Sequence, residues 1–356
     1  MRSWVLLACL LATATAAPRA EAAETRFSLA GTWPGGAAIE RIEGREVTYP
    51  SASPFSPADF ADLSEAPKAT ARATLFLPPG KHKPRSLPAV IMLHGSGGVL
   101  SARELTYGRQ LAAMGIAALA IDAFAARREL GRGFIDRLLN ITESMMIADA
   151  YAGLGWLAET HPAIDPKRVA LVGFSYGAMA SMYAMNARVA QQLGRGLAFA
   201  GHVAFYGPCI ARFSDKRTTG APLLYLYGTA DILIDRARCE RFAADLREGG
   251  SQAEIVAYEG APHQWDGGWG RRTIGRTMHG CRLWVERDGT VRDLNTFLPM
   301  STPFTRKIIL GLCANGPPYP IGADEAVRQR SNRDLGRFLA RVFGLEDGSP
   351  ATRRAR

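Results

Sequence analysis

The chain has 356 residues, of which 47% are hydrophobic and 21% are charged. This length and composition favour one large folded domain and exclude an elongated or disordered protein. The formal net charge is +10, but apart from a late arginine-rich segment and the tail at 353–356 the positive residues are scattered. No aromatic-basic motif accompanies them, so we expect a solvated basic surface and no nucleic-acid partner.

Residues 1–23 are typical of a secretory signal. A short basic start at Arg2 precedes the apolar run 5–12, and small residues follow it. Cys9 could belong to a lipoprotein site, but too little apolar sequence precedes it. The run is also too short to span a bilayer, so we expect no stable membrane anchor. We therefore predict an exported protein, periplasmic or secreted, whose mature chain is a single domain at 24–356.

Alternating strand and helix patterns predict an α/β fold with a mainly parallel central sheet flanked by helices. Residues 45–49 and 71–77 alternate polar and apolar side chains, as leading antiparallel strands would, and 50–57 is expected to be a loop. A buried strand is predicted at 115–122. Apolar residues at helical spacing then predict a helix over 145–156.

A glycine-rich loop follows the predicted buried strand 88–93. Its sequence, His94-Gly95-Ser96-Gly97-Gly98, lacks most side chains that would keep backbone amides away from a ligand. Such a loop can donate N–H groups to the anionic oxygen of a tetrahedral intermediate, and we expect one donor from Gly95 or Ser96. We expect His94 to hold the loop through a hydrogen bond. The alternative is a glycine loop that only turns the chain.

Ser175 lies in the sequence Gly-Phe-Ser-Tyr-Gly at 173–177. The apolar run 169–172 precedes it and a helix-like stretch at 178–182 follows. This is the strand-turn-helix setting of a nucleophile elbow, in which the glycines accommodate a sharp and strained turn. The amide of Tyr176 is then the second expected oxyanion donor.

A serine hydroxyl needs a general base and a group that orients the base. A strand-like run at 222–227 leads to Asp231, which we predict to be the orienting acid, with nearby Asp235 as the alternative. Another run at 253–258 leads to His263, the predicted base. Serine, aspartate, histidine is the chain order of α/β-hydrolases. The histidines without this position are His82, His94, His161, His202 and His279.

These segments together resemble the dienelactone hydrolase family within the α/β-hydrolase superfamily. The resemblance runs from about Ala71 to His263, includes the strand-end segment 205–209, and resumes in the amphipathic final helix near 335–343. It implies an α/β-hydrolase fold with a catalytic triad. The namesake lactonases have cysteine at the elbow, where this chain has Ser175.

Four cysteines remain after the signal segment: Cys209, Cys239, Cys281 and Cys313. In an oxidising compartment an even set suggests disulfides, and three pairings are possible. We favour Cys209 with Cys239, which neighbouring strands would bring together, and Cys281 with Cys313; free buried thiols are the alternative. None has the spacing of a zinc site, and we expect neither a metal nor an organic cofactor.

Between His263 and the final helix lies an insertion at about 264–322, rich in tryptophan, arginine and proline. We expect a weakly structured segment that is either a lid or substrate-contact element, or a surface excursion held by a disulfide.

The sequence therefore predicts an exported serine hydrolase that cleaves small-molecule carboxylic esters, or lactones, through an acyl-enzyme intermediate. The alternatives are a peptidase of the prolyl-oligopeptidase type and a non-catalytic binding protein with the same fold. Nothing in the sequence indicates an oligomeric state.

Overall fold

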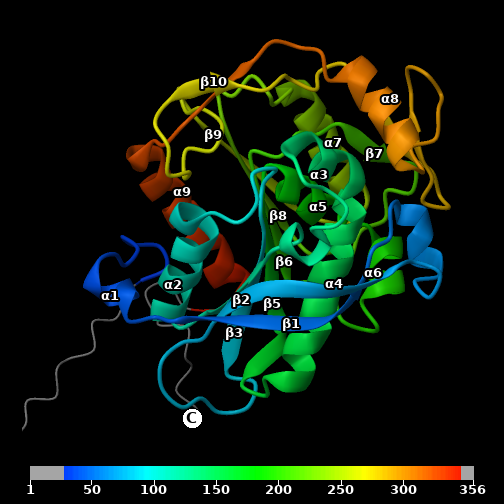
Figure 1. Cartoon of the computed structure of the whole chain (residues 1–356). Coiled ribbons are helices and arrows are strands. Elements are labelled where there is room, and N and C mark those ends of the chain that lie inside the picture. The colour runs from blue at the N-terminus through cyan, green and yellow to red at the C-terminus, as the bar shows by residue number, and fades with distance from the viewer. Residues whose placement is uncertain (1–27, 346–356) are drawn as a thin grey trace, which may run out of the picture.

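A computed structural model describes residues 28–345; the predicted signal segment lies outside them. Within these residues eight strands form one sheet, in the order β1-β2-β4-β3-β5-β6-β8-β9 (Figure 1). The strands are β1 (Gly44–Ala52), β2 (Lys68–Phe76), β3 (Leu87–Leu93), β4 (Ala117–Ile121), β5 (Ile164–Phe174), β6 (Gly201–Phe205), β8 (Leu223–Gly228) and β9 (Ala253–Tyr258).

The sheet is antiparallel only at its beginning. β2 pairs antiparallel with both β1 and β4, whereas every pairing from β4 to β9 is parallel. The predicted mainly parallel α/β fold is therefore confirmed. The expectation of a loop over 50–57 was wrong for its first three residues. Pro50, Ser51 and Ala52 continue β1 and pair with β2. Pro50 is tolerated there because β1 lies at the edge of the sheet.

Helices cover both faces of the sheet (Figure 1). They are α2 (Thr106–Ala113), α4 (Glu143–Thr160), α5 (Tyr176–Tyr183), α6 (Ala187–Leu193), α7 (Arg236–Glu248) and α9 (Glu325–Phe343). Val90 and Met92 of β3 belong to a hydrophobic cluster with α2 and α9. Ile91 and Leu93 face the other way, into a cluster with α4, α5, α6 and α7. Alternate residues of one strand thus serve both halves of the core.

Shorter helical segments lie in the connections. They are α1 (Ala37–Glu40), α3 (Phe134–Asn140), α8 (Pro303–Cys313), 3₁₀ turns at Pro57–Ala61 and Ala125–Arg127, and a π-helical turn at Ser101–Leu105. The final helix α9 begins at an Asp324 cap and ends at Gly344 in the left-handed conformation. Residues 28–345 contain no helix with both the length and the apolar character needed to cross a membrane.

The insertion at 264–322 is more ordered than the sequence suggested. β10 (Arg272–Ile274) pairs with β13 (Tyr319–Ile321), while β11 (Leu283–Val285) lies between β12 (Val291–Asp293) and β7 (Ala211–Phe213). Helix α8 lies between β12 and β13 in the chain. The prediction of weak structure was wrong because strands of three residues are too short to produce a recognisable alternation.

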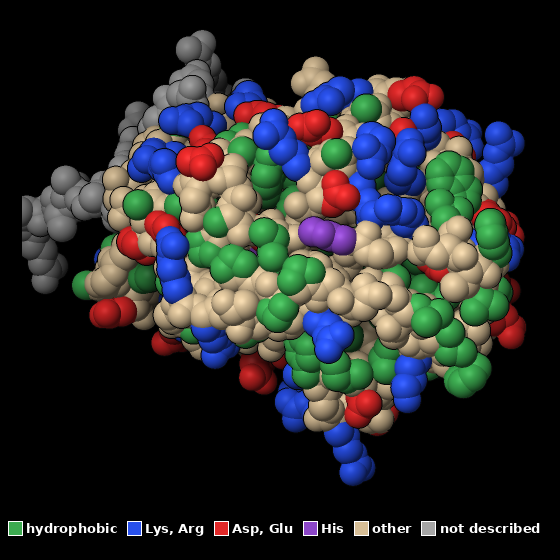
Figure 2. Space-filling model, turned by 90° about the horizontal axis from the view of Figure 1, so that it is seen from above, with side chains coloured by type: hydrophobic (Ala, Val, Ile, Leu, Met, Phe, Trp, Pro, Cys, Tyr) green, Lys and Arg blue, Asp and Glu red, His purple; other side chains and the backbone are tan. Residues whose placement is uncertain are grey.

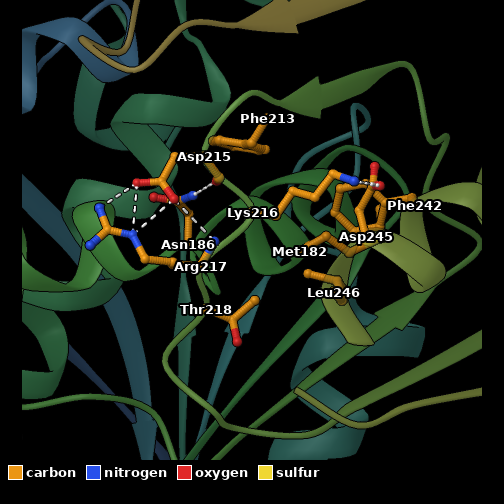
Figure 3. A pocket seen from close by; sticks show the side chains of 10 residues that line it. All are labelled: Met182, Asn186, Phe213, Asp215, Lys216, Arg217, Thr218, Phe242, Asp245 and Leu246. Atoms are coloured by element: carbon orange, nitrogen blue, oxygen red, sulfur yellow. Dashed lines mark hydrogen bonds and ion pairs between the residues drawn. The ribbon is translucent and has the colours of Figure 1, made fainter. Parts of the chain in front are cut away.

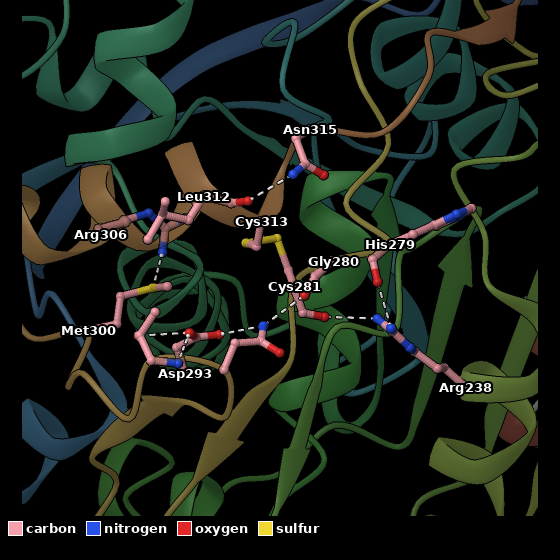
Figure 4. Close-up of a disulfide and its surroundings, with 12 residues drawn as sticks. Arg238, His279, Gly280, Cys281, Asp293, Met300, Arg306, Leu312, Cys313 and Asn315 are labelled. Carbon is pink, nitrogen blue, oxygen red and sulfur yellow. Dashed lines mark hydrogen bonds between the residues drawn. A yellow bond between two sulfur atoms is a disulfide. The ribbon is translucent and has the colours of Figure 1, made fainter.

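Two cysteine pairs lie at disulfide distance. Cys209 and Cys239 have Cα atoms 5.1 Å apart and join the segment after β6 to α7. Cys281 and Cys313 have Cα atoms 4.6 Å apart and join two parts of the insertion, the segment before β11 and the last residue of α8 (Figure 4). These are the two pairings that the sequence favoured.

Replacing Cys209 and Cys239 together by alanine should lower the free energy of unfolding. Their sequence separation is 30, and closing a loop of that size in the unfolded chain corresponds to roughly 3–4 kcal/mol at 25 °C. Urea unfolding of wild type and double variant in non-reducing buffer measures the difference. An unchanged transition midpoint would show that these two cysteines are not cross-linked in solution.

Candidate active site

The three side chains singled out in the sequence converge at the carboxyl ends of parallel strands. Ser175 follows β5, Asp231 follows β8 and His263 follows β9. The hydroxyl of Ser175 lies 2.9 Å from Nε2 of His263, and Nδ1 of the same ring lies 2.6 Å from Oδ2 of Asp231. All three residues are buried, with Ser175 6% exposed. A hydroxyl, an imidazole and a carboxylate in this order have the geometry that an acyl-transfer site needs.

The turn that carries Ser175 is strained. Its φ of 51° and ψ of −106° lie in a region that side-chain-bearing residues rarely adopt. A Cβ on Gly173 would collide with the carbonyl of Gly177, and one on Gly177 would collide with the carbonyl of Leu93. Only glycine therefore fits at both positions, which explains the spacing in the elbow.

The structure distinguishes Asp231 from the alternative acid. One oxygen of Asp231 faces His263, and the other accepts the N–H of Leu233 at 3.0 Å. Asp235 instead begins α7, where it accepts the backbone N–H of Arg238 at 3.1 Å. The side chain of Asp235 is thus occupied as a helix cap.

Two loops meet beside Ser175. Tyr176 is the first residue of α5, so its N–H is one of those that a helix leaves without an internal acceptor. A Cβ built on Gly95 would stand 3.4 Å from the Cβ of Ser175, so the glycine-rich loop passes directly against the elbow. His94 donates its Nδ1 proton to the carbonyl of Gly95 at 2.7 Å, and burial lowers the pKa of His94. A neutral His94 therefore braces this loop.

A tyrosine that the sequence did not single out packs behind the base. The ring of Tyr206 stands edge-on to the ring of His263, with centroids 4.7 Å apart. Its hydroxyl donates to Oδ1 of Asp266 at 2.5 Å. Burial raises the pKa of Tyr206, which keeps the hydroxyl protonated as a donor. The one sequence feature that could have indicated Tyr206 is its position directly after β6, a strand that lies between those carrying Ser175 and Asp231.

Arg103 is a second residue that sequence analysis missed. It is fully buried, pairs with Glu104 at 2.8 Å, and lies 4.9 Å from the ring centre of Phe174, the residue before the elbow serine. One guanidinium nitrogen is 3.4 Å from the hydroxyl of Tyr206. Arg103 thus connects the elbow to Tyr206, which packs behind His263. The sequence around Arg103 gives no sign of these contacts, because both partners are distant in the chain.

The insertion touches the site from two sides. The N–H of His263 donates to the carbonyl of Pro320 at 3.0 Å, and the ring of Tyr319 lies edge-on to that of His263 at 5.3 Å. From α8, Arg306 donates to the hydroxyl of Tyr176 at 3.1 Å. The insertion therefore contacts both His263 and Tyr176, which favours a substrate-contact element over a surface excursion.

Another pocket of the described chain is separate from Ser175, Asp231 and His263. A pocket between α5, α7 and residues 213–218 (Figure 3) has an ion pair between Lys216 and Asp245 at 3.0 Å in its lining. That lining includes none of Ser175, Asp231 and His263. Within 28–345 no group of three or more His, Cys, Asp or Glu side chains is arranged to hold a metal ion.

Figure 2 views the molecule from the side of β10 and α8. Lys and Arg side chains are spread over this face with apolar groups between them. In the described chain eight of the ten exposed large apolar side chains lie on two segments, 130–135 and 294–312. These residues are Leu130, Phe134, Ile135, Leu294, Phe297, Leu298, Phe304 and Leu312.

Solved structures with partial similarity include three hydrolases. One, assigned as a dienelactone hydrolase, from Klebsiella pneumoniae, is 22% identical, with 62% of this chain and 88% of that one covered and a TM-score of 0.44. A dienelactone hydrolase-like promiscuous phosphotriesterase from metagenomic libraries is 20% identical, with 63% and 84% covered and a TM-score of 0.45. A propionate-bound esterase from Thermogutta terrifontis is 17% identical, with 64% and 86% covered and a TM-score of 0.45.

The sequence profile of the dienelactone hydrolase family matches residues 72–266. That range holds the glycine-rich loop, the elbow, Asp231 and His263, and it is more than half of the chain. No curated protein matches the sequence. On the family match, and with a mostly parallel sheet flanked by helices, the chain belongs to the dienelactone hydrolase family and is a carboxylic ester hydrolase with the α/β-hydrolase fold.

Proposed function

We propose that this hydrolase is a serine esterase that works through an acyl-enzyme intermediate. The observation that carries the proposal is the hydrogen-bonded row of Ser175, His263 and Asp231. Ser175 attacks the ester carbonyl while Nε2 of His263 accepts its proton, and Asp231 holds the ring and stabilises the imidazolium. His263 then gives this proton to the departing alcohol. This row and the family membership both support catalysis over a binding-only role.

The tetrahedral intermediate carries a negative oxygen that needs preorganised donors. We propose the N–H of Tyr176 for one of them and the N–H of Gly95 or Ser96 for the other. The contact of the glycine-rich loop with the elbow supports this assignment. In the second half of the reaction, His263 deprotonates a water molecule, which attacks the acyl-enzyme and releases the acid. None of these steps requires a metal or an organic cofactor.

The recessed position of Ser175 supports a small-molecule ester or lactone as the substrate. A nucleophile that is 6% exposed suits a compact carbonyl compound better than a folded polypeptide, which weighs against the peptidase alternative. Two cysteine pairs at disulfide distance support an oxidising compartment and hence export.

A fluorophosphonate probe tests the proposed nucleophile. The wild-type chain should be modified at Ser175 and should hydrolyse p-nitrophenyl acetate, whereas Ser175→Ala should remain unmodified and lose hydrolysis. Mass spectrometry of the labelled peptide identifies the modified residue. A folded wild-type protein that the probe does not modify at Ser175 would sink the proposal.

The assignment of the acid is tested by a matched pair of variants. Asp231→Asn should lower kcat by roughly 10⁴-fold, because the ring of His263 loses the carboxylate that selects its tautomer. Asp235→Asn should leave kcat near wild type, since asparagine caps a helix as well as aspartate does. Steady-state hydrolysis of p-nitrophenyl acetate gives both values. Equal losses in the two variants would contradict the assignment.

We further propose that the insertion borders the substrate pocket through Tyr319, whose ring lies beside His263. Tyr319→Ala should change the ratio of kcat/KM for hexanoate and acetate esters by about tenfold, which is typical when a pocket wall is altered. Tyr319→Phe keeps the ring and should leave the ratio unchanged. A ratio unaffected by Tyr319→Ala would remove this residue from the pocket.

A further inference from the structure

The insertion sends one buried arginine toward the nucleophile elbow. Arg306 is on α8 and is 7% exposed. Its Nη2 donates to the hydroxyl of Tyr176 at 3.1 Å and lies 3.0 Å from a carboxylate oxygen of Glu143. Its Nε donates to the carbonyl of Leu138 at 3.0 Å. One guanidinium therefore joins α8, the end of α3, the start of α4 and the residue after Ser175.

Tyr176 is held at its far end as well as by its backbone. Its hydroxyl donates to the carbonyl of Ile141 at 2.7 Å while it accepts from Arg306. Burial raises the pKa of Tyr176, so the hydroxyl keeps the proton that this donation needs. One donated and one accepted hydrogen bond restrict the position of the side chain. Fixing the side chain also limits rotation of the peptide between Ser175 and Tyr176.

We propose that Arg306 is a positioning residue for the oxyanion donor, the backbone N–H of Tyr176. The inference rests on the proposed acyl-transfer function. It adds to that function a residue of the insertion, which lies far from the elbow in the chain. An oxyanion donor must point at the place where the charge develops, and small misplacements are costly. Arg306 maintains that direction without touching the substrate.

The choice of residue types fits this role. A buried charge is costly unless it is paired and hydrogen-bonded, and Glu143 supplies the pair. The planar fork of arginine reaches Tyr176, Glu143 and the carbonyl of Leu138 together, whereas one lysine ammonium is a compact point charge on a flexible stem. A contact needed only for packing would not require this set of donors.

Helix α8 has a capped start and a cross-linked end, which together favour a defined position for Arg306. Thr302 caps the start of the helix, and Cys313 at its end pairs with Cys281. Arg238 of α7 donates to the carbonyls of Cys281 and His279 at 2.8 and 2.6 Å (Figure 4). The helix is thus fastened to the part of the fold that follows the acid loop.

The test compares Arg306→Met with two controls on the full chain. With p-nitrophenyl acetate, Arg306→Met should lower kcat by about 10- to 100-fold and leave KM within about twofold. Lys307→Met removes the same charge from an exposed neighbour on α8 and should leave kcat unchanged. Arg127→Met breaks a different buried pair, with Asp149 at 2.6 Å. It should lower Tm at least as much as Arg306→Met while retaining most of kcat.

A double-mutant cycle with Tyr176→Phe separates positioning from general destabilisation. If Arg306 acts through the Tyr176 hydroxyl, Arg306→Met should lower kcat far less in the Tyr176→Phe background than in wild type. Fully additive effects would overturn the inference, as would an Arg306→Met variant with lowered Tm and wild-type kcat. In either case fluorophosphonate labelling of wild-type Ser175 leaves the proposed function intact. A wild-type chain that is not labelled overturns both.

Discussion

The parallel pairing of β5, β6, β8 and β9 is the constraint from which the site follows. Parallel strands all end at the same edge, so residues that follow β5, β8 and β9 meet there although they are far apart in the chain. β6, β8 and the last six residues of β5 are buried throughout, and close packing of these strands makes the edge rigid. A rigid edge can hold a strained turn at Ser175, because the energy of that single residue is small beside that of the surrounding core.

Around this edge the protein places polar groups where water has little access. Arg103 with Glu104 and Arg306 with Glu143 are buried ion pairs on two sides of the elbow. Each pair is costly to bury, and each is combined with hydrogen bonds to neighbouring tyrosines. In a low-dielectric interior such networks have few alternative arrangements, which favours one geometry of the loops that they join.

The insertion contacts two of the residues proposed for the site. Its strand β13 hydrogen-bonds to the backbone of His263, and its helix α8 reaches Tyr176. The segment therefore contacts both the base and the predicted oxyanion donor, and the Cys281–Cys313 pair ties it together. Its short strands are held by pairing, β11 with β7 and β12, and β10 with β13, and not by a hydrophobic pattern of their own.

The sequence by itself determined the α/β architecture, because long buried strands and an amphipathic final helix leave strong periodic patterns. It also indicated Ser175, Asp231 and His263, since each follows such a strand and the glycine spacing at the elbow has a steric cause. Only the tertiary structure showed the contacts that Tyr206, Arg103 and Arg306 make around the site. Arg103 pairs with its neighbour Glu104, but the contacts that link these three residues to the site come from distant parts of the chain. A buried arginine or tyrosine has no local sequence signature of such contacts.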